Sequence, residues 1–220
     1  MKWNVGVDFQ IGALQATMAG LLQGDTIHHA LGIPIFGQGH ATTGSNQDIK
    51  IAKSILQWRW LIIDEISMVS AKLLARIDMK LRHYARTVDP YAIYGNAATR
   101  PFGGLNVICS GDFWQLPPPD GGFLGDGPFE YIQASRRYVP SASISHGQSL
   151  LWSGPDTGIQ GVTELHKCER NKEEWLRSVQ GKNRVGQWTD ETHAFLQGNP
   201  TMQLGSFLKG IFRCQKTNLQ

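Results

Sequence analysis

The chain has 220 residues, enough for one domain and the start of another. Hydrophobic residues make up 41% of it and charged residues 18%, which argues against an intrinsically disordered polypeptide. The net charge of +3 permits nucleic-acid binding. The chain nevertheless lacks the large excess of basic residues that is typical of proteins that bind nucleic acid by electrostatics alone.

The cysteines Cys109, Cys168 and Cys214 are too widely and irregularly spaced for a disulfide framework or a zinc site, so we expect reduced thiols. The N-terminus lacks the charged and apolar pattern of a signal peptide. No apolar stretch approaches the roughly 18 residues that a membrane span requires. The sequence therefore predicts a soluble protein inside the cell that does not enter a membrane.

The first thirty residues show no clear hydrophobic periodicity, and residues 33–48 are rich in Gly and Thr, which is typical of a loop. Apolar side chains at helical spacing predict a helix over residues 49–58. A short, continuous apolar run follows at residues 60–63 and ends at Asp64-Glu65. Such a run is typical of a buried parallel strand.

Leucine and isoleucine at helical spacing predict a helix over residues 68–84, with Ser70 as its N-cap. A second β-type run covers residues 105–109 and is followed at once by Ser110-Gly111-Asp112. Two such strands with a helix between them favour a parallel sheet.

Loops are predicted farther along the chain, because Pro and Gly dominate residues 117–127 and residues 141–161 are also loop-rich. A third strand is expected at residues 161–165. Short helices are expected at residues 171–180 and 189–196.

The alternation of strands and helices predicts an α/β domain with a mostly parallel sheet. Ligands of such sheets bind beyond the carboxyl ends of the strands. The two clearest predicted strands deliver Asp64, Glu65 and Asp112 to that edge.

An apolar strand that ends in Asp-Glu is the Walker B pattern. Asp64 can hold Mg²⁺ through water, because this ion keeps much of its hydration shell. Glu65 can orient or deprotonate the water that attacks a phosphoryl group. Taken alone, the pattern is weak, and a structural strand that ends in acidic residues at a turn is the commoner case.

A second motif runs from Gly111 to Pro118, after the tight-turn glycines Gly103 and Gly104. The amide of Gln115 can form a hydrogen bond with a phosphate oxygen or with the attacking water, and the prolines stiffen the chain after it. Alone, this motif also fits a proline-rich turn with a buried aromatic pair. That alternative is hard to maintain for this chain, because the motif follows the strand that ends in Asp64-Glu65, in this order and at this separation.

Together, residues 64–68 and 111–118 resemble motifs II and III of the Pif family of DNA helicases, in helicase superfamily one. Residues 24–33 resemble motif Ia of that family, which implies that Thr26 and His28 lie near single-stranded DNA.

Residues 163–170 resemble motif IV, and the matches together cover roughly residues 16–198. By this resemblance Asp64 would hold magnesium and Glu65 would be the catalytic base. Gln115 and Arg170 would sense the γ-phosphate.

The resemblance implies a RecA-like P-loop NTPase fold, with ATP and Mg²⁺ as cofactors. It also implies 5′-to-3′ translocation on single-stranded DNA, unwinding at duplex junctions, and roles in telomere maintenance, repair and recombination. A monomer in the nucleus or the mitochondrion is expected.

Two domains are expected: residues 1–160 as a partial first RecA-like domain, and residues 161–220 as the motif IV region and the start of a second. The phosphate-gripping loop Gly-x-x-x-x-Gly-Lys-Ser/Thr does not occur in the chain. Its place in the family falls before Met1, so we expect a fold that is incomplete at the N-terminus. The chain by itself should hydrolyse ATP very slowly or not at all. The alternatives are a non-catalytic DNA-binding or regulatory relic, or a degenerate product without a stable fold.

Four aromatic residues lie before the first motif or within the second: Trp58, Trp60, Phe113 and Trp114. Aromatic side chains next to a nucleic-acid site can stack on bases. Packing in the core is the commoner use of such residues, and we expect it for all four.

Overall fold

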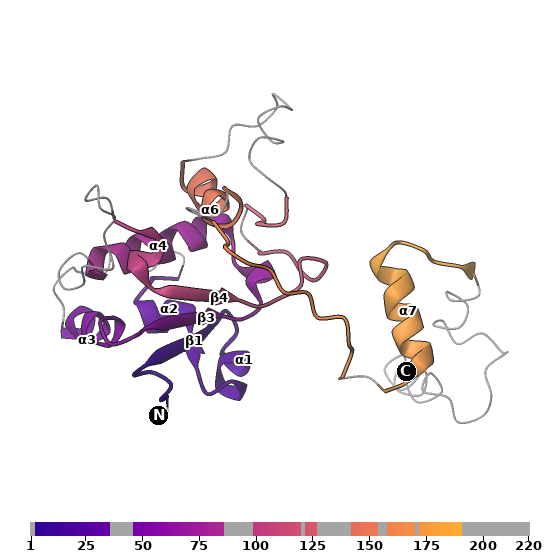
Figure 1. The fold of residues 1–220 in the computed structure, drawn as a ribbon, viewed down its shortest axis with the longest axis horizontal. Helices are drawn as coiled ribbons and strands as arrows, with labels where there is room; N and C mark the ends of the chain where they lie inside the picture. The colour runs from indigo at the N-terminus through magenta and orange to yellow at the C-terminus, as the bar shows by residue number, and fades with distance from the viewer. Residues whose placement is uncertain are drawn as a thin grey trace, which may run out of the picture. The chain divides into compact units, whose positions relative to one another are not determined.

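The computed structural model describes residues 3–35, 46–85, 99–119, 122–126, 142–153, 158–169 and 172–190. The chain divides into two compact units, Met1–Val162 and Thr163–Gln220. In the first unit, the strands labelled in Figure 1 lie side by side with helices packed around them.

The first unit is built on a parallel sheet of four strands. They are β1 (Phe9–Ala13), β2 (Asp25–Thr26), β3 (Trp60–Ile63) and β4 (Asn106–Cys109), in the spatial order β2-β1-β3-β4. Each neighbouring pair is parallel. The predicted α/β fold with a parallel sheet is therefore confirmed, and the two strands predicted from apolar runs are β3 and β4.

Helices connect the strands and cover the sheet. In chain order they are α1 (Ala16–Leu21), α2 (Ile27–Leu31), α3 (Asn46–Ile55), the 3₁₀ turn η1 (Ile66–Met68), α4 (Ala71–Ala85), the 3₁₀ turn η3 (Pro101–Gly104) and α6 (Ala142–Trp152). The helix predicted at residues 68–84 is α4, and the Leu73 N–H donates to Ser70 Oγ at 3.2 Å, which confirms the predicted N-cap.

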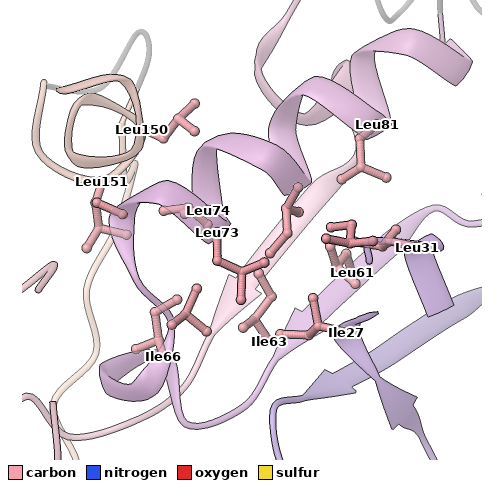
Figure 2. Close-up of a cluster of buried hydrophobic side chains, with 14 of the residues drawn as sticks. Ile27, Leu31, Leu61, Ile63, Ile66, Leu73, Leu74, Leu81, Leu150 and Leu151 are labelled. Carbon is pink, nitrogen blue, oxygen red and sulfur yellow. The ribbon is translucent and has the colours of Figure 1, made fainter. Parts of the chain in front are cut away.

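The core lies between β3 and α4. Leu61 and Ile63 point toward α4, as Figure 2 shows, and both are buried. Leu74 and Leu81 meet them from the helix and have no exposed surface. Burial of this apolar surface holds α4 against the sheet.

Two expectations about secondary structure are wrong. Helix α6 lies where a loop was predicted, because Ile144, Leu150 and Leu151 bury their side chains in the core beside α4. No strand forms at residues 161–165 among the described residues. Val162 is 82% exposed and Leu165 is 90% exposed, so this apolar run has neither a neighbouring strand nor a core to join.

Strand β1 was missed by the sequence analysis, because Gln10 and Gly12 interrupt its apolar character. It nevertheless pairs with both β2 and β3 and lies inside the sheet.

The second unit contains one described helix, α7 (Glu174–Arg184), close to the helix predicted at residues 171–180. None of its residues is buried. The helix predicted at residues 189–196 falls mostly outside the described residues. In the part of the chain that the structure describes, no helix has the length and apolar character needed to span a bilayer.

Candidate functional site

The carboxyl ends of β3 and β4 bring the two sequence motifs together. These strands are adjacent and parallel, with Ile63 paired with Cys109, so Asp64 and Ser110 leave the sheet at the same edge. The Ser110 hydroxyl donates to Asp64 Oδ1 at 2.6 Å. The Asp64 N–H donates to the Gly12 carbonyl of β1 at 2.9 Å. The Asp64 carboxylate is thus oriented by one neighbouring strand, and its backbone is held by the other.

Glu65 occupies the left-handed backbone region, with φ 54° and ψ 51°. For a residue with a side chain, this conformation costs about 1–3 kcal/mol and is commonest at functional sites. The next residue is held in place, since the Ile66 N–H donates to the Ser110 carbonyl at 2.9 Å. Asp64 therefore contacts Ser110, whereas Glu65 lines a pocket beside it.

Gly111 makes the close approach of the two motifs possible. Its φ is 154°, and a Cβ atom at this position would lie 2.8 Å from the backbone nitrogen of Ile66. A side chain here would push the second motif away from the Asp64-Glu65 turn.

The residues after Gly111 form a turn around Asp112. The Trp114 N–H donates to Asp112 Oδ1 at 3.0 Å, and the Gln115 N–H donates to the Asp112 carbonyl at 2.9 Å. Phe113 packs edge-on against Phe123, with ring centroids 5.9 Å apart. The turn thereby buries part of Phe113 and presents Trp114 and Gln115 outward.

The expectation that all four aromatic residues pack in the core holds only in part. Trp58 is 6% exposed, and its indole N–H donates to the Gly6 carbonyl at 3.1 Å. Phe113 is half-buried. Trp60 is 36% exposed and Trp114 is 76% exposed, so neither is a core residue. Alternation of side chains along β3 explains Trp60, because Leu61 and Ile63 take the covered face.

A pocket of about 550 Å³ lies at this edge of the sheet. Its lining combines both motifs with the segment after β1: Ala13, Leu14, Gln15, Met18, Glu65, Ser67, Met68, Trp114, Gln115, Leu116 and Pro117. The structure therefore brings Glu65 and Gln115 into one cavity. Pockets of a few hundred Å³ with few polar groups are typical of ligand sites.

Thr26 and His28 lie on the neighbouring strand and helix. The β1–β2 register pairs Thr26 with Ala13, which also lines the pocket. The Thr26 hydroxyl accepts the His29 N–H at 3.3 Å and caps α2. His28 is half-buried, in the first turn of α2. Arg170 lies outside the described residues.

Asp64 can supply one carboxylate oxygen ligand of the kind that Mg²⁺ requires. Ser110 occupies one of its two carboxylate oxygens, and Mg²⁺ binds hard oxygen donors while keeping most of its waters. Within the described ranges, no group of three or more His, Cys, Asp or Glu side chains could hold a metal ion. The residues present fit an ion whose other ligands are water and phosphate.

The sequence analysis missed two residues of this site. Ser110 was noted only as the residue that follows the second predicted strand, and its contact with Asp64 depends on the pairing of β3 with β4. Gln15 lies in a stretch without any motif and reaches the pocket because β1 lies inside the sheet. No local sequence pattern predicts either the contact between Ser110 and Asp64 or the place of Gln15 in the pocket.

Comparison with known proteins identifies a single family. Residues 13–122, half of the chain, match the family model of PIF1-like helicases. The ATP-dependent DNA helicase PIF1 of Saccharomyces cerevisiae is 32% identical to the chain over 118 residues. This match covers 52% of the chain and 12% of the yeast protein, so the chain spans about an eighth of that relative.

Solved structures agree in fold. A Pif1 helicase from Bacteroides in complex with ADP-AlF3 and single-stranded DNA has a TM-score of 0.61 and 23% identity, covering 96% of this chain and 47% of that one. A Bacteroides Pif1 bound to single-stranded DNA has a TM-score of 0.61 and 26% identity, covering 91% and 42%. The sheet and its helices therefore have the RecA-like α/β fold of these helicases.

Proposed function

Because this chain belongs to the PIF1-like helicase family, we propose that it is part of an ATP-dependent DNA helicase motor. One arrangement supports this most directly: Glu65 and Gln115, from adjacent strand ends, share a pocket beside Asp64. Both lie in the segment that matches the family. In this proposal residues 1–160 belong to the first RecA-like domain, and residues 161–220 carry motif IV and the start of the second.

The chain's own residues take distinct roles in ATP hydrolysis. Asp64 would hold Mg²⁺, and the bound ion would supply positive charge that neutralises the phosphates. Glu65 orients the attacking water and accepts its proton, a role supported by its place in the lining of the pocket. Gln115 forms a hydrogen bond with the water or the γ-phosphate, and Arg170 is assigned to the γ-phosphate by its place in motif IV.

The partner is single-stranded DNA, reached through Thr26 and His28, and the motor moves 5′ to 3′ toward duplex junctions. Family kinship supports roles in telomere maintenance, repair and recombination, in the nucleus or the mitochondrion, and action as a monomer. A DNA site beside the pocket is supported by the pairing of Thr26 with Ala13.

By itself, the 220-residue chain should hydrolyse ATP slowly or not at all, because it contains no Gly-x-x-x-x-Gly-Lys-Ser/Thr loop to hold the phosphates. A coupled ATPase assay with single-stranded DNA tests this expectation. Robust turnover that disappears in the Glu65→Gln variant would contradict it.

A second candidate function is DNA binding without catalysis. The exposed pocket and the motif Ia residues favour it, since both are present in this chain. Thermal unfolding with Mg²⁺ and a non-hydrolysable ATP analogue separates the two functions. A nucleotide-dependent rise in Tm that Asp64→Asn removes supports the motor. An unchanged Tm together with DNA binding supports the non-catalytic function.

A further inference from the structure

A second cavity, of about 290 Å³, lies in the first unit where α3 and α4 meet. Among the described residues, its polar lining is formed by Asp48, Arg76, Lys80, His83 and Tyr84. It shares no described residue with the pocket at the carboxyl edge of the sheet. This cavity, the α3–α4 groove, is therefore a separate feature to which the proposed function gives no role.

One face of α4 carries the basic side chains of the groove. At helical spacing along this face stand Lys72, Arg76, Lys80 and His83. The stretch they cover rises about 16 Å along the helix axis, which spans several phosphates of a DNA strand. The one acidic residue of α4, Asp78, is buried and accepts a hydrogen bond from Arg82. The groove face of α4 is therefore positive.

The acidic residue of the groove, Asp48, is already compensated by its neighbours. Its Oδ1 lies 3.3 Å from Lys80 Nζ and also accepts the Tyr84 hydroxyl. The Lys80 ammonium lies 5.3 Å from the centroid of the Tyr84 ring, in a cation–π contact. These contacts hold Lys80 at the wall of the groove, so an anion that enters meets a positioned cation.

Arg76 supplies the positive charge that the groove leaves uncompensated. Its Nη2 donates to the Pro34 carbonyl at 3.2 Å, and among the described residues no carboxylate forms an ion pair with it. The guanidinium is planar and carries several N–H donors, a geometry that matches the oxygens of a phosphate. Ile33 and Met79 add apolar surface beside it, against which a sugar can pack.

The groove begins where the candidate DNA segment ends. Helix α2, which carries His28, is capped by Gly32 in the left-handed region, with φ 58°. The Ile33 N–H then donates to the His28 carbonyl at 2.8 Å, and the next residue, Pro34, accepts the bond from Arg76. A short hydrogen-bonded path therefore fixes Arg76 relative to the proposed DNA contact.

We propose that the α3–α4 groove binds a phosphate of the DNA backbone, held by Arg76 and Lys80, next to the contact at Thr26 and His28. The inference rests on the proposed function, because it assumes that the chain binds DNA. It adds a phosphate site that lies outside the nucleotide pocket and extends the DNA-binding surface from α2 to α4.

The test measures binding of a labelled thymidine oligonucleotide to the full 220-residue chain by fluorescence anisotropy over a range of salt concentrations. Arg76→Gln removes one phosphate contact. It should weaken binding about five- to tenfold at about 50 mM salt and lower the slope of log affinity against log salt by about 0.7. Arg76→Lys keeps the charge and should keep most of the slope.

Asp48→Asn should change the affinity in the opposite direction. It removes the negative charge of the groove and releases Lys80 from its ion pair. Binding should therefore tighten about two- to fivefold, the size expected for one partly exposed charge pair. A substitution that merely disturbed the fold would weaken binding instead.

Arg177→Gln is the matched control, because Arg177 is an exposed arginine of α7 in the second unit. It should leave affinity and salt slope unchanged. Replacing single phosphates of the oligonucleotide with uncharged methylphosphonates then identifies the bound phosphate. One such replacement should weaken binding to the wild type and have no effect on Arg76→Gln.

The outcomes separate this inference from the proposed function. If the wild-type chain binds no oligonucleotide, the proposed DNA partner is wrong, and the inference fails with it. If the chain binds DNA and Arg76→Gln retains both affinity and salt slope, or a folded Asp48→Asn variant binds more weakly, the phosphate site alone is overturned. Far-ultraviolet circular dichroism checks the fold of each variant, and Arg76→Lys with Asp48→Asn carries the test if Arg76→Gln unfolds.

Discussion

Helices α6 and α7 are each eleven residues long and each contain one internal glycine, yet they differ completely in environment. Helix α6 buries five residues against the first unit, and α7 buries none. In α6, a Cβ on Gly147 would collide with α4, whereas in α7 no atom of the described residues lies within 4 Å of the Cβ position of Gly181. Helical periodicity in the sequence therefore does not reveal which helix has a tertiary partner.

The largest effect is expected at Asp78, which joins α6 to α4 and η3. Its carboxylate has no exposed surface and accepts the Arg82 Nε–H at 2.7 Å and the Phe102 N–H at 2.6 Å. His146 Nε2 of α6 lies 2.7 Å from the same carboxylate. Asp78→Ala should lower the free energy of unfolding by about 3–5 kcal/mol, because it leaves these donors without their acceptor. Urea denaturation measures the change.

The control for Asp78 is Glu164→Ala in the second unit, which removes an exposed carboxylate near His166. Its loss should not measurably change the urea midpoint, because water replaces so exposed a contact. Similar midpoints for Asp78→Ala and the wild type would show that the buried cluster does not hold the first unit together.

The next largest effect is expected for Gly147→Ala. The added Cβ would lie 1.8 Å from the carbonyl oxygen of Ala71 and 2.5 Å from its carbonyl carbon, and both are backbone atoms that have little room to move. Helix α6 would have to shift away from α4, at a cost of about 3 kcal/mol. A fall in Tm measured by circular dichroism is the expected result. An unchanged Tm would mean that the two helices are not in this close contact.

The two units should also differ in thiol reactivity. Burial raises the pKa of Cys109 from 9.0 to about 11, whereas Cys168 in the second unit is exposed. A raised pKa lowers the thiolate population at pH 8, here by about a hundredfold, and the thiolate is the reactive form. Iodoacetamide should therefore modify Cys168 well before Cys109, as mass spectrometry of the peptides would show. In denaturant the difference should disappear, and equal rates in the native state would contradict the burial of Cys109.

The smallest effect is expected for Gly181→Ala, the counterpart of Gly147→Ala. Alanine favours a helix over glycine by about 1 kcal/mol, and an added Cβ at Gly181 meets no atom of the described part of the chain. Helix content measured by circular dichroism should rise slightly or stay the same. A loss of helix would mean that α7 has a close neighbour at this glycine.

The sequence predicted those elements whose pattern is local and continuous. The apolar run at residues 60–63 was sufficient to predict β3, and the helical spacing of leucines was sufficient to predict α4. Strand β1 was missed because Gln10 and Gly12 look polar or flexible in isolation, and α6 was missed because its serines resemble a loop. The run at residues 161–165 was overpredicted, because a strand needs a neighbour and local sequence does not supply one.

The candidate site shows the same limit. The sequence assigned Asp64, Glu65 and Asp112 to strand ends and Gln115 to the motif that follows. The left-handed backbone at Glu65 and the contact between Ser110 and Asp64 arise from the pairing of β3 with β4. Trp114 was assigned to the core because tryptophans usually lie there. The turn around Asp112 instead turns its indole outward.

The central claim is that residues 13–122 form a working part of a helicase motor. The most direct test transfers them into the Bacteroides Pif1 helicase in place of the aligned segment and measures ATP hydrolysis with single-stranded DNA. We predict DNA-stimulated hydrolysis that Glu65→Gln lowers about a hundredfold or more. A chimera that unfolds cooperatively and binds single-stranded DNA but hydrolyses no ATP, or whose hydrolysis survives Glu65→Gln, would contradict the account.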